Sequence, residues 1–240
     1  MIKKIKWIFI WFGLKFLKIG LRYRIQGEGR LWLQPFIVTG IINRNDWVLK
    51  YVRNKKVLHI GFADAPFTEE RIHDETLLHT HLKKAAQFIF GIDTNMNAVH
   101  SYSKFTGDTE VKSIGIEDMH AQELADYDIF LIGEVLEHVE SPLILIEDLK
   151  NKLISGQQLI VTVPNYISFD SLSAVLHETE SVHADHHWYF SPYTLAKKFS
   201  PDFWRQEKLI FGLYGEKKPN FIQKDFPAIA DCIVIVLSKK

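Results

Sequence analysis

The chain has 240 residues, 47% of them apolar and 24% charged, which is typical of a globular protein with a large core. Its 29 basic and 29 acidic side chains cancel, and this balance argues against nucleic acid as a partner. The single cysteine, Cys232, rules out a disulfide within the chain and indicates a reducing compartment, so we expect a cytoplasmic protein.

The first 20 residues are both apolar and basic. The apolar block at residues 7–14 is shorter than the roughly 20 residues of a membrane-spanning helix, and no small-residue cleavage site follows it. Two interpretations stay open: a helix that lies on an anionic membrane surface, at the inner face of the membrane, or a helix packed against the domain. Asn45 and Asp46 can cap a later helix. We predict an N-terminal helical extension over residues 1–54.

A strand, a turn of small residues, one long helix and a second strand are predicted next. The first strand covers residues 57–60, and the turn after it contains Gly61 and Ala63. The second strand covers residues 88–92 and ends at Asp93. Small residues let the backbone approach a ligand, and a carboxylate at the end of the second strand can accept both hydroxyls of a ribose. The pattern therefore predicts a nucleoside site.

Strands and helices alternate through the rest of the chain, as in a parallel, doubly wound α/β sheet whose ligands lie at the carboxyl ends of the strands. Residues 219–227 are expected to form a long connection. The further predicted strands cover residues 111–116, 129–132, 158–163, 208–213 and 232–237, and the predicted helices cover residues 94–105, 141–154, 169–177 and a segment that ends near residue 199.

The most specific motif lies in residues 128–165, which read DIFLIGEVLEHVESPLILIEDLKNKLISGQQLIVTVPN. An acid, a buried strand, the run V-L-E-H-V, a helix and a strand that ends in Pro-Asn resemble the corresponding segment of class I S-adenosylmethionine-dependent methyltransferases. The resemblance implies a mostly parallel, seven-stranded Rossmann-like sheet over residues 55–240. It also implies an acceptor-binding insert at about residues 166–200 and S-adenosylmethionine as the cofactor.

The resemblance assigns cofactor-binding roles position by position. It places the turn after the first strand under the methionine part of the cofactor, Asp93 on the ribose, the residues after the third strand at the adenine, and those after the fourth strand beside the methyl group. The residues implied are His59, Gly61, Ala63, Asp93, Thr94, Glu117, Asp118, Met119, Gly133 and Glu134. For Glu137 and His138, helix capping and ligand contact both stay open.

Three departures from the family pattern raise an alternative. His59 stands where the family usually has a carboxylate, Ala63 stands where it usually has glycine, and the stretch from Gly61 to Asp93 exceeds the roughly 20 residues expected. The alternative is a catalytically silent relative that acts through a partner or a membrane. A nicotinamide-dependent dehydrogenase is disfavoured, because the full G-x-G-x-x-G fingerprint is missing.

The resemblance implies methyl transfer to a small molecule or a glycan, and we expect a hydroxyl oxygen as the acceptor atom. A hydroxyl acceptor needs a general base, and imidazole titrates near neutral pH. The candidates are His183, His186 and His187, which lie in the expected insert; the alternative is that they anchor a lid. These histidines with Asp185 could also suggest zinc, but adjacent histidines in a strand point to opposite sides, so we expect no metal.

Overall fold

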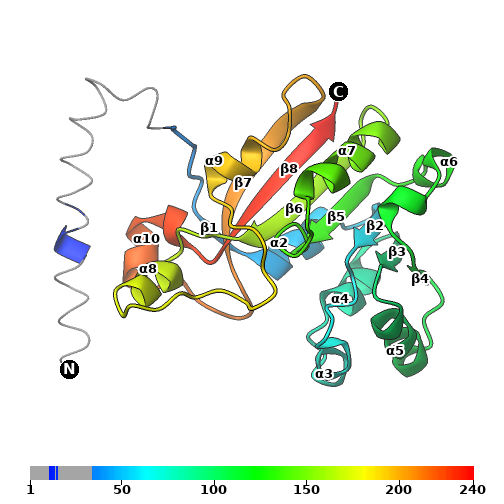
Figure 1. Ribbon diagram of the computed structural model, residues 1–240, viewed down its shortest axis with the longest axis horizontal. Coiled ribbons are helices and arrows are strands. Elements are labelled where there is room, and N and C mark those ends of the chain that lie inside the picture. The colour runs from blue at the N-terminus through cyan, green and yellow to red at the C-terminus, as the bar shows by residue number, and fades with distance from the viewer. Residues whose placement is uncertain (1–10, 14, 16–33) are drawn as a thin grey trace.

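The computed structural model describes residues 11–13, 15 and 34–240, so the predicted interfacial helix of residues 1–20 lies almost wholly outside the described residues. Within them, eight strands form one sheet in the order β1-β7-β8-β6-β5-β2-β3-β4 (Figure 1). The strands are β1 (Ile41–Asn43), β2 (Lys56–Ile60), β3 (Phe88–Asp93), β4 (Val111–Ser113), β5 (Ile129–Gly133), β6 (Gln158–Pro164), β7 (Trp204–Leu213) and β8 (Cys232–Lys239).

Helices connect most of these strands. The helices are α2 (Arg44–Tyr51), α3 (Thr68–His73), α4 (Leu78–Ala85), α5 (Met96–Thr106), α6 (Ala121–Leu124), α7 (Pro142–Lys152), α8 (Phe169–Val175), α9 (Pro192–Ala196) and α10 (Phe221–Asp225), with short 3-10 turns η1 (Ile116–Asp118) and η2 (Pro227–Ile229). In the segments that the structure describes, none of these helices has the length and apolar character needed to cross a bilayer.

The sheet confirms the predicted doubly wound architecture. Five pairs of neighbouring strands in the described sheet are parallel: β1–β7, β2–β3, β2–β5, β3–β4 and β5–β6. The strand β8 runs antiparallel to its neighbours, β6 and β7. The chain runs outward from β2 to β4 and then returns to place β5 on the other side of β2. The direction of winding therefore reverses between β2 and β5, which is where doubly wound folds bind their ligands.

The predicted count of seven strands is wrong by one. The additional strand, β1, is three residues long and pairs with β7 at the edge of the sheet. A strand this short has no periodicity that a sequence pattern can reveal. The predicted boundary between an N-terminal extension (residues 1–54) and a methyltransferase domain (residues 55–240) stays a prediction. Two elements before this boundary, β1 and α2, pack with the sheet.

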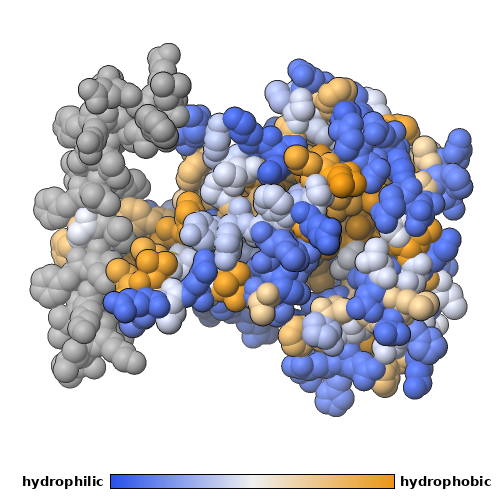
Figure 2. Space-filling view, in the orientation of Figure 1, coloured by the Kyte–Doolittle hydropathy of each residue, from blue (hydrophilic) through white to orange (hydrophobic). Residues whose placement is uncertain are grey.

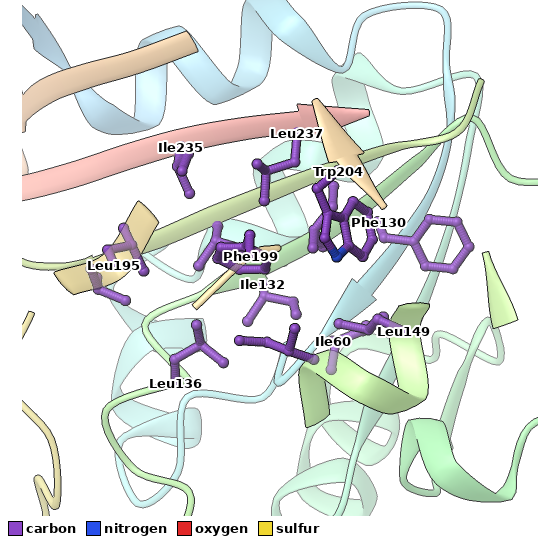
Figure 3. Close-up of a cluster of buried hydrophobic side chains, with 14 of the residues drawn as sticks. Ile60, Phe130, Ile132, Leu136, Leu149, Leu195, Phe199, Trp204, Ile235 and Leu237 are labelled. Carbon is purple, nitrogen blue, oxygen red and sulfur yellow. The ribbon is translucent and has the colours of Figure 1, made fainter. Parts of the chain in front are cut away.

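Side chains alternate between the two faces of the central strands, as the pleat requires. On β5, Ile129 and Leu131 face a cluster covered by α2 and α4. Phe130 and Ile132 face the opposite cluster, which α7 covers. Figure 3 shows side chains of this second cluster, with Phe130, Ile132, Leu149, Leu195 and Phe199 among those labelled. Because both faces are buried, β5 reads as a continuous apolar run in the sequence.

The long helix predicted after Gly61 is two short ones, α3 and α4. The chain leaves the helical path between them, where Glu75 has a positive φ of 55° and Leu77 is extended. Leu77 is thereby placed in the core, 1% exposed, against Phe62 and the helix α5. Burial of this apolar side chain favours the break between the two helices.

Smaller differences occur at the ends of elements. The predicted strand at residues 111–116 ends at Ser113, and the 3-10 turn η1 follows it. The predicted connection at residues 219–227 contains α10, whose cap residue Asn220 accepts hydrogen bonds from the N–H groups of Ile222 and Gln223. Figure 2 shows apolar side chains gathered near α8 and α10, where Val175, Leu176 and Phe221 are exposed.

Cys232 lies in β8 with no solvent exposure, and burial raises the pKa of its thiol well above the ordinary value. Both effects suppress the thiolate that reacts with disulfide reagents. We expect the native protein to react with Ellman's reagent at least about a hundredfold more slowly than the urea-unfolded chain. Equal rates for the native and unfolded chains would contradict the burial of β8.

Candidate functional site

A pocket of about 1750 Å³ opens at the carboxyl ends of β2, β3 and β5. Its wall includes Gly61 after β2, Asp93 and Thr94 at the end of β3, and Gly133 and Glu134 at the end of β5. The sequence predicted that these residues bind one ligand, and the structure brings them to one pocket. The pocket lies where the winding of the sheet reverses.

The turn after β2 requires glycine at its first position. Gly61 has a φ of +73°, its N–H donates to the carbonyl of Ile92 at 2.8 Å, and a Cβ built on it would lie 2.3 Å from Cγ2 of Val135. A side chain here would be strained by the backbone and would also clash. The backbone of the turn therefore forms a smooth wall of the pocket.

Asp93 closes β3 with its carboxylate at the pocket. One oxygen accepts from the N–H of Ala63 at 3.1 Å, and the other accepts from the N–H of Asn95 at 2.8 Å. Burial raises the pKa of Asp93, while these two hydrogen bonds act in the opposite direction. The bonds fix the carboxylate between the turn and α5, and each oxygen keeps a lone pair for a ligand. Ala63 itself is fully buried and does not line the pocket.

The segment after β4 contributes less than the resemblance implied. Glu117 lines the pocket, but Asp118 is exposed outside it and Met119 is buried in the core beside Ile116. The 3-10 turn η1 is the physical reason, because its tight winding turns consecutive side chains to different sides. Of the three residues predicted at the adenine, only Glu117 is placed to contact a ligand in this pocket.

Glu134 is held by three partners. Arg44 of α2 approaches one carboxylate oxygen at 3.3 Å, Thr162 of β6 donates to the same oxygen at 2.7 Å, and the hydroxyl of Tyr214 donates to the other oxygen. Burial, and then the charge of Glu134, raises the pKa of Tyr214 well above its ordinary value, so that hydroxyl keeps its proton. Glu134 itself has a positive φ of 57°. This network fixes the backbone at the end of β5.

Replacing Arg44 by methionine should lower the free energy of unfolding by about 3 kcal/mol, since a carboxylate whose side chain is only 23% exposed would lose its cation. Urea unfolding measures the change. The matched control is the double variant R44M/E134Q, in which no uncompensated charge remains, and it should recover part of the loss. Equal stability of wild type and R44M would contradict the proposed importance of this pair.

His59 meets His79 beneath the turn. Their Nδ1 atoms lie 3.2 Å apart, and the exposed fractions of the two side chains are 3% and zero. Burial lowers the pKa of His79 to about 3, and burial together with His79 lowers the pKa of His59 well below its ordinary value. Both imidazoles are therefore neutral, one as donor and one as acceptor. His59 reaches the pocket wall, but the pair acts mainly in the core.

Glycine at position 91 makes room for this pair. Gly91 lies opposite His59 in the β2–β3 register, and a Cβ there would come within 2.8 Å of the Phe62 ring and 2.9 Å of the His79 ring. The rings of Phe62 and His79 occupy the space that a side chain at position 91 would need. The unusual histidine of the first motif is thus explained by a second histidine, brought to it by the break between α3 and α4.

A second group of side chains faces the same pocket after β5. Glu137 and His138 come from the loop that follows β5, and His183, Asp185 and His186 come from the loop before α9. Asp185 contacts both His138, at 3.0 Å between Nδ1 and Oδ2, and Nδ1 of His183. The rings of His138 and His186 lie 4.6 Å apart, edge to face.

His187, the third predicted histidine, does not belong to this group. Its side chain is exposed and does not line the pocket, whereas its backbone N–H donates to the carbonyl of Glu137 at 2.8 Å. Neighbouring residues in extended chain point to opposite sides, so His186 and His187 cannot both face inward. Two of the three predicted histidines, His183 and His186, lie at the pocket.

Comparison with known proteins identifies the architecture. No family model matches the sequence, and no curated protein sequence matches it. Among solved structures, the chain is similar to the small RNA methyltransferase HEN1 (TM-score 0.56, 18% identity, 82% of this chain and 25% of that chain) and to the plantazolicin methyltransferase BpumL in complex with S-adenosylhomocysteine (0.53, 16%, 82% and 80%). A further structure is an S-adenosylmethionine-dependent methyltransferase from Archaeoglobus fulgidus (0.52, 16%, 81% and 90%).

The chain has the class I methyltransferase fold. This confirms the fold that the V-L-E-H-V segment predicted. The identities are low, so the acceptors of these proteins are properties of those proteins alone.

Sequence patterns missed several residues of this methyltransferase fold that meet at the pocket. Arg44 and Tyr214 join Glu134 from opposite ends of the chain, and neither stands in a motif. For Glu137 the structure excludes helix capping, because the cap residue of α7 is Ser141. The signal that was available was V-L-E-H-V itself, which contains Glu137 and His138.

Proposed function

We propose that the protein is an S-adenosylmethionine-dependent methyltransferase that acts on a hydroxyl oxygen of a small molecule or a glycan. The observation that carries the proposal is the position of Asp93, whose carboxylate ends β3 at the same pocket as the glycine turn after β2. In this fold that arrangement suits an adenosyl group, because the ribose hydroxyls need an acceptor and the turn must allow close approach.

The residues present fit this cofactor. Asp93 has lone pairs available for the ribose, Gly61 has no side chain to obstruct the pocket, and Glu117 offers a carboxylate where an exocyclic amine would donate. S-adenosylmethionine supplies an electrophilic methyl group on a sulfonium. The contribution of the protein is to orient the acceptor and to remove its proton.

His183 is the proposed general base. It lines the pocket, and its Nδ1 contacts the carboxylate of Asp185. Nε2 would take the hydroxyl proton as the acceptor oxygen bonds to the methyl carbon and the bond from that carbon to the sulfonium sulfur breaks, which releases S-adenosylhomocysteine. A base oriented by a third group is the usual arrangement in such sites. Phe67 meets the His183 ring edge to face at 6.1 Å and is 39% exposed, so an apolar ring lies beside hydrogen-bonding groups, and this combination supports a sugar or a small alcohol as the acceptor.

A radiolabel assay tests the proposal. Wild type is incubated with S-adenosylmethionine that carries a labelled methyl group and with a panel of sugars and small alcohols, and the label in the acceptor is counted. We expect transfer by wild type, and a fall in kcat of about a hundredfold or more in His183→Gln with unchanged binding of S-adenosylhomocysteine. His187→Gln, at an exposed position, is the matched control.

Failure to bind S-adenosylmethionine at all, measured by calorimetry, would favour the silent relative that the sequence left as the alternative. Binding without transfer to any hydroxyl compound would contradict the acceptor class alone. Cytoplasmic location, membrane contact through residues 1–20 and the absence of nucleic acid as an acceptor remain predictions.

A further inference from the structure

Glu137 is a buried acidic residue whose side-chain oxygens lack hydrogen-bond partners among the described residues. It is 1% exposed. A buried carboxyl group that lacks partners costs several kcal/mol, and such groups in native proteins are usually paired or bound to a cation.

Two imidazoles stand beside this carboxylate. Glu137, His138 and His186 each offer one ligand atom, and the three atoms lie within 4.8 Å of one another. All three residues line the pocket. Two histidines and one carboxylate with room on one side are the ligand set of many catalytic metal sites.

Asp185 adds the support that metal-binding histidines commonly have. Its carboxylate contacts Nδ1 of His138 at 3.0 Å, and it also contacts His183. An imidazole that ligates a metal through one nitrogen generally uses the other to bond a carboxylate, which fixes the orientation of the ring.

Hydrogen bonds to backbone carbonyls hold the loop after β5 against the loop before α9, and the three proposed ligand side chains take no part in them. The N–H groups of His187 and Trp188 donate to the carbonyl of Glu137 at 2.8 and 3.2 Å, and the indole N–H of Trp188 donates to the carbonyl of Val139 at 3.0 Å. The residues that would ligate an ion are therefore held together in advance. Preorganisation of this kind is what a tight site needs.

We propose that Glu137, His138 and His186 bind a divalent transition-metal ion in the pocket. Imidazole and carboxylate together suit Zn²⁺ and Co²⁺ better than Mg²⁺, which prefers oxygen ligands alone. The argument against a metal from the sequence rested on the pair His186 and His187. In the structure, the other two ligands are Glu137 and His138, from the loop after β5. Three protein ligands leave a position open to the pocket. The proposal that the ion binds does not depend on the proposed methyl transfer. A role for the ion in holding an acceptor oxygen would rest on that proposed function.

Titration of the untagged, EDTA-treated full chain with Co²⁺ and Zn²⁺ tests the site by calorimetry and, for Co²⁺, by visible absorption. We expect one ion per chain, with weaker binding of Mg²⁺. Glu137→Gln and His186→Ala should each weaken binding at least about a hundredfold, since each removes one of three ligands. His187→Ala is the matched control and should bind as wild type does.

Three results would overturn the proposal: no stoichiometric binding of Co²⁺ or Zn²⁺ by wild type, unchanged affinity in Glu137→Gln, or an equal loss in His187→Ala. Circular dichroism and thermal unfolding verify that each variant is folded. If a variant does not fold, the visible absorption of Co²⁺ bound to the wild-type protein still tests the proposal. Titration of the same samples with S-adenosylhomocysteine is a separate readout. Loss of metal binding with retained nucleoside binding, or the reverse, shows which of the two proposals fails.

Discussion

Replacement of Asp93 by alanine should weaken the binding of S-adenosylhomocysteine at least about a hundredfold, because two hydrogen bonds to a charged acceptor, worth about 1.5–3 kcal/mol each, would be lost. The same change removes the acceptor for the N–H groups of Ala63 and Asn95, which loosens the turn. Isothermal titration calorimetry measures the affinity.

Asp118→Ala is the matched control for this change. Asp118 is also a carboxylate that the sequence placed at the cofactor, but it is exposed and outside the pocket. We expect Asp118→Ala to bind as wild type does. Equal affinities of wild type and Asp93→Ala would contradict the position proposed for the ribose.

Acid should unfold this protein through His59 and His79. Both are neutral in the native state because burial lowers their pKa, to about 3 for His79, whereas in the unfolded chain each has a pKa near 6.5. Below that value the unfolded chain binds protons that the native state excludes, so stability falls as pH falls. The slope is about 1.4 kcal/mol per pH unit for His79 between about pH 6.5 and 4.5, and His59 adds to it in the same direction.

Urea unfolding at several pH values between about 7.5 and 4.5 measures this slope. His79→Phe keeps a planar ring in the core and removes one titrating group, so its slope should be shallower by about 1.4 kcal/mol per pH unit. Asp108 raises and Lys83 lowers the pKa of His79, and Arg44 lowers the pKa of His59. Identical slopes in wild type and His79→Phe would show that the buried pair does not govern acid stability.

The sheet was predictable because buried parallel strands leave continuous apolar runs, such as residues 129–132, between helices. What the sequence did not reveal is structure that depends on contacts between distant segments. The strand β1 exists because β7 offers it an edge, and α3 and α4 separate because Leu77 has a place in the core beside Phe62. The local periodicity of the sequence predicts neither the strand β1 nor the break between α3 and α4.

The departures in the first motif have a structural explanation. The alanine at position 63 contributes only its backbone N–H, to Asp93, and Gly61 is the glycine that the turn needs at its first position. The histidine at position 59 is matched by His79 from a segment 20 positions later in the chain. The altered glycine pattern therefore does not by itself point to loss of cofactor binding.

The candidate site was predictable where one strand end follows another, as at Gly61, Asp93 and Glu134, because the fold aligns those ends. It was not predictable where a side chain arrives from a loop or from a distant element. Met119 turned into the core, His187 turned to solvent, and Arg44 joined Glu134 from α2. In each case the direction of a side chain, which a motif does not encode, decided the outcome.

A crystal structure of the protein with S-adenosylhomocysteine tests the central claim most directly. The claim predicts the ribose hydroxyls on the carboxylate of Asp93, the homocysteine part against the turn at Gly61, and the sulfur facing the side chains of His183 and Glu137. A pocket that stays empty at saturating S-adenosylhomocysteine, or a nucleoside bound elsewhere on the chain, would contradict it.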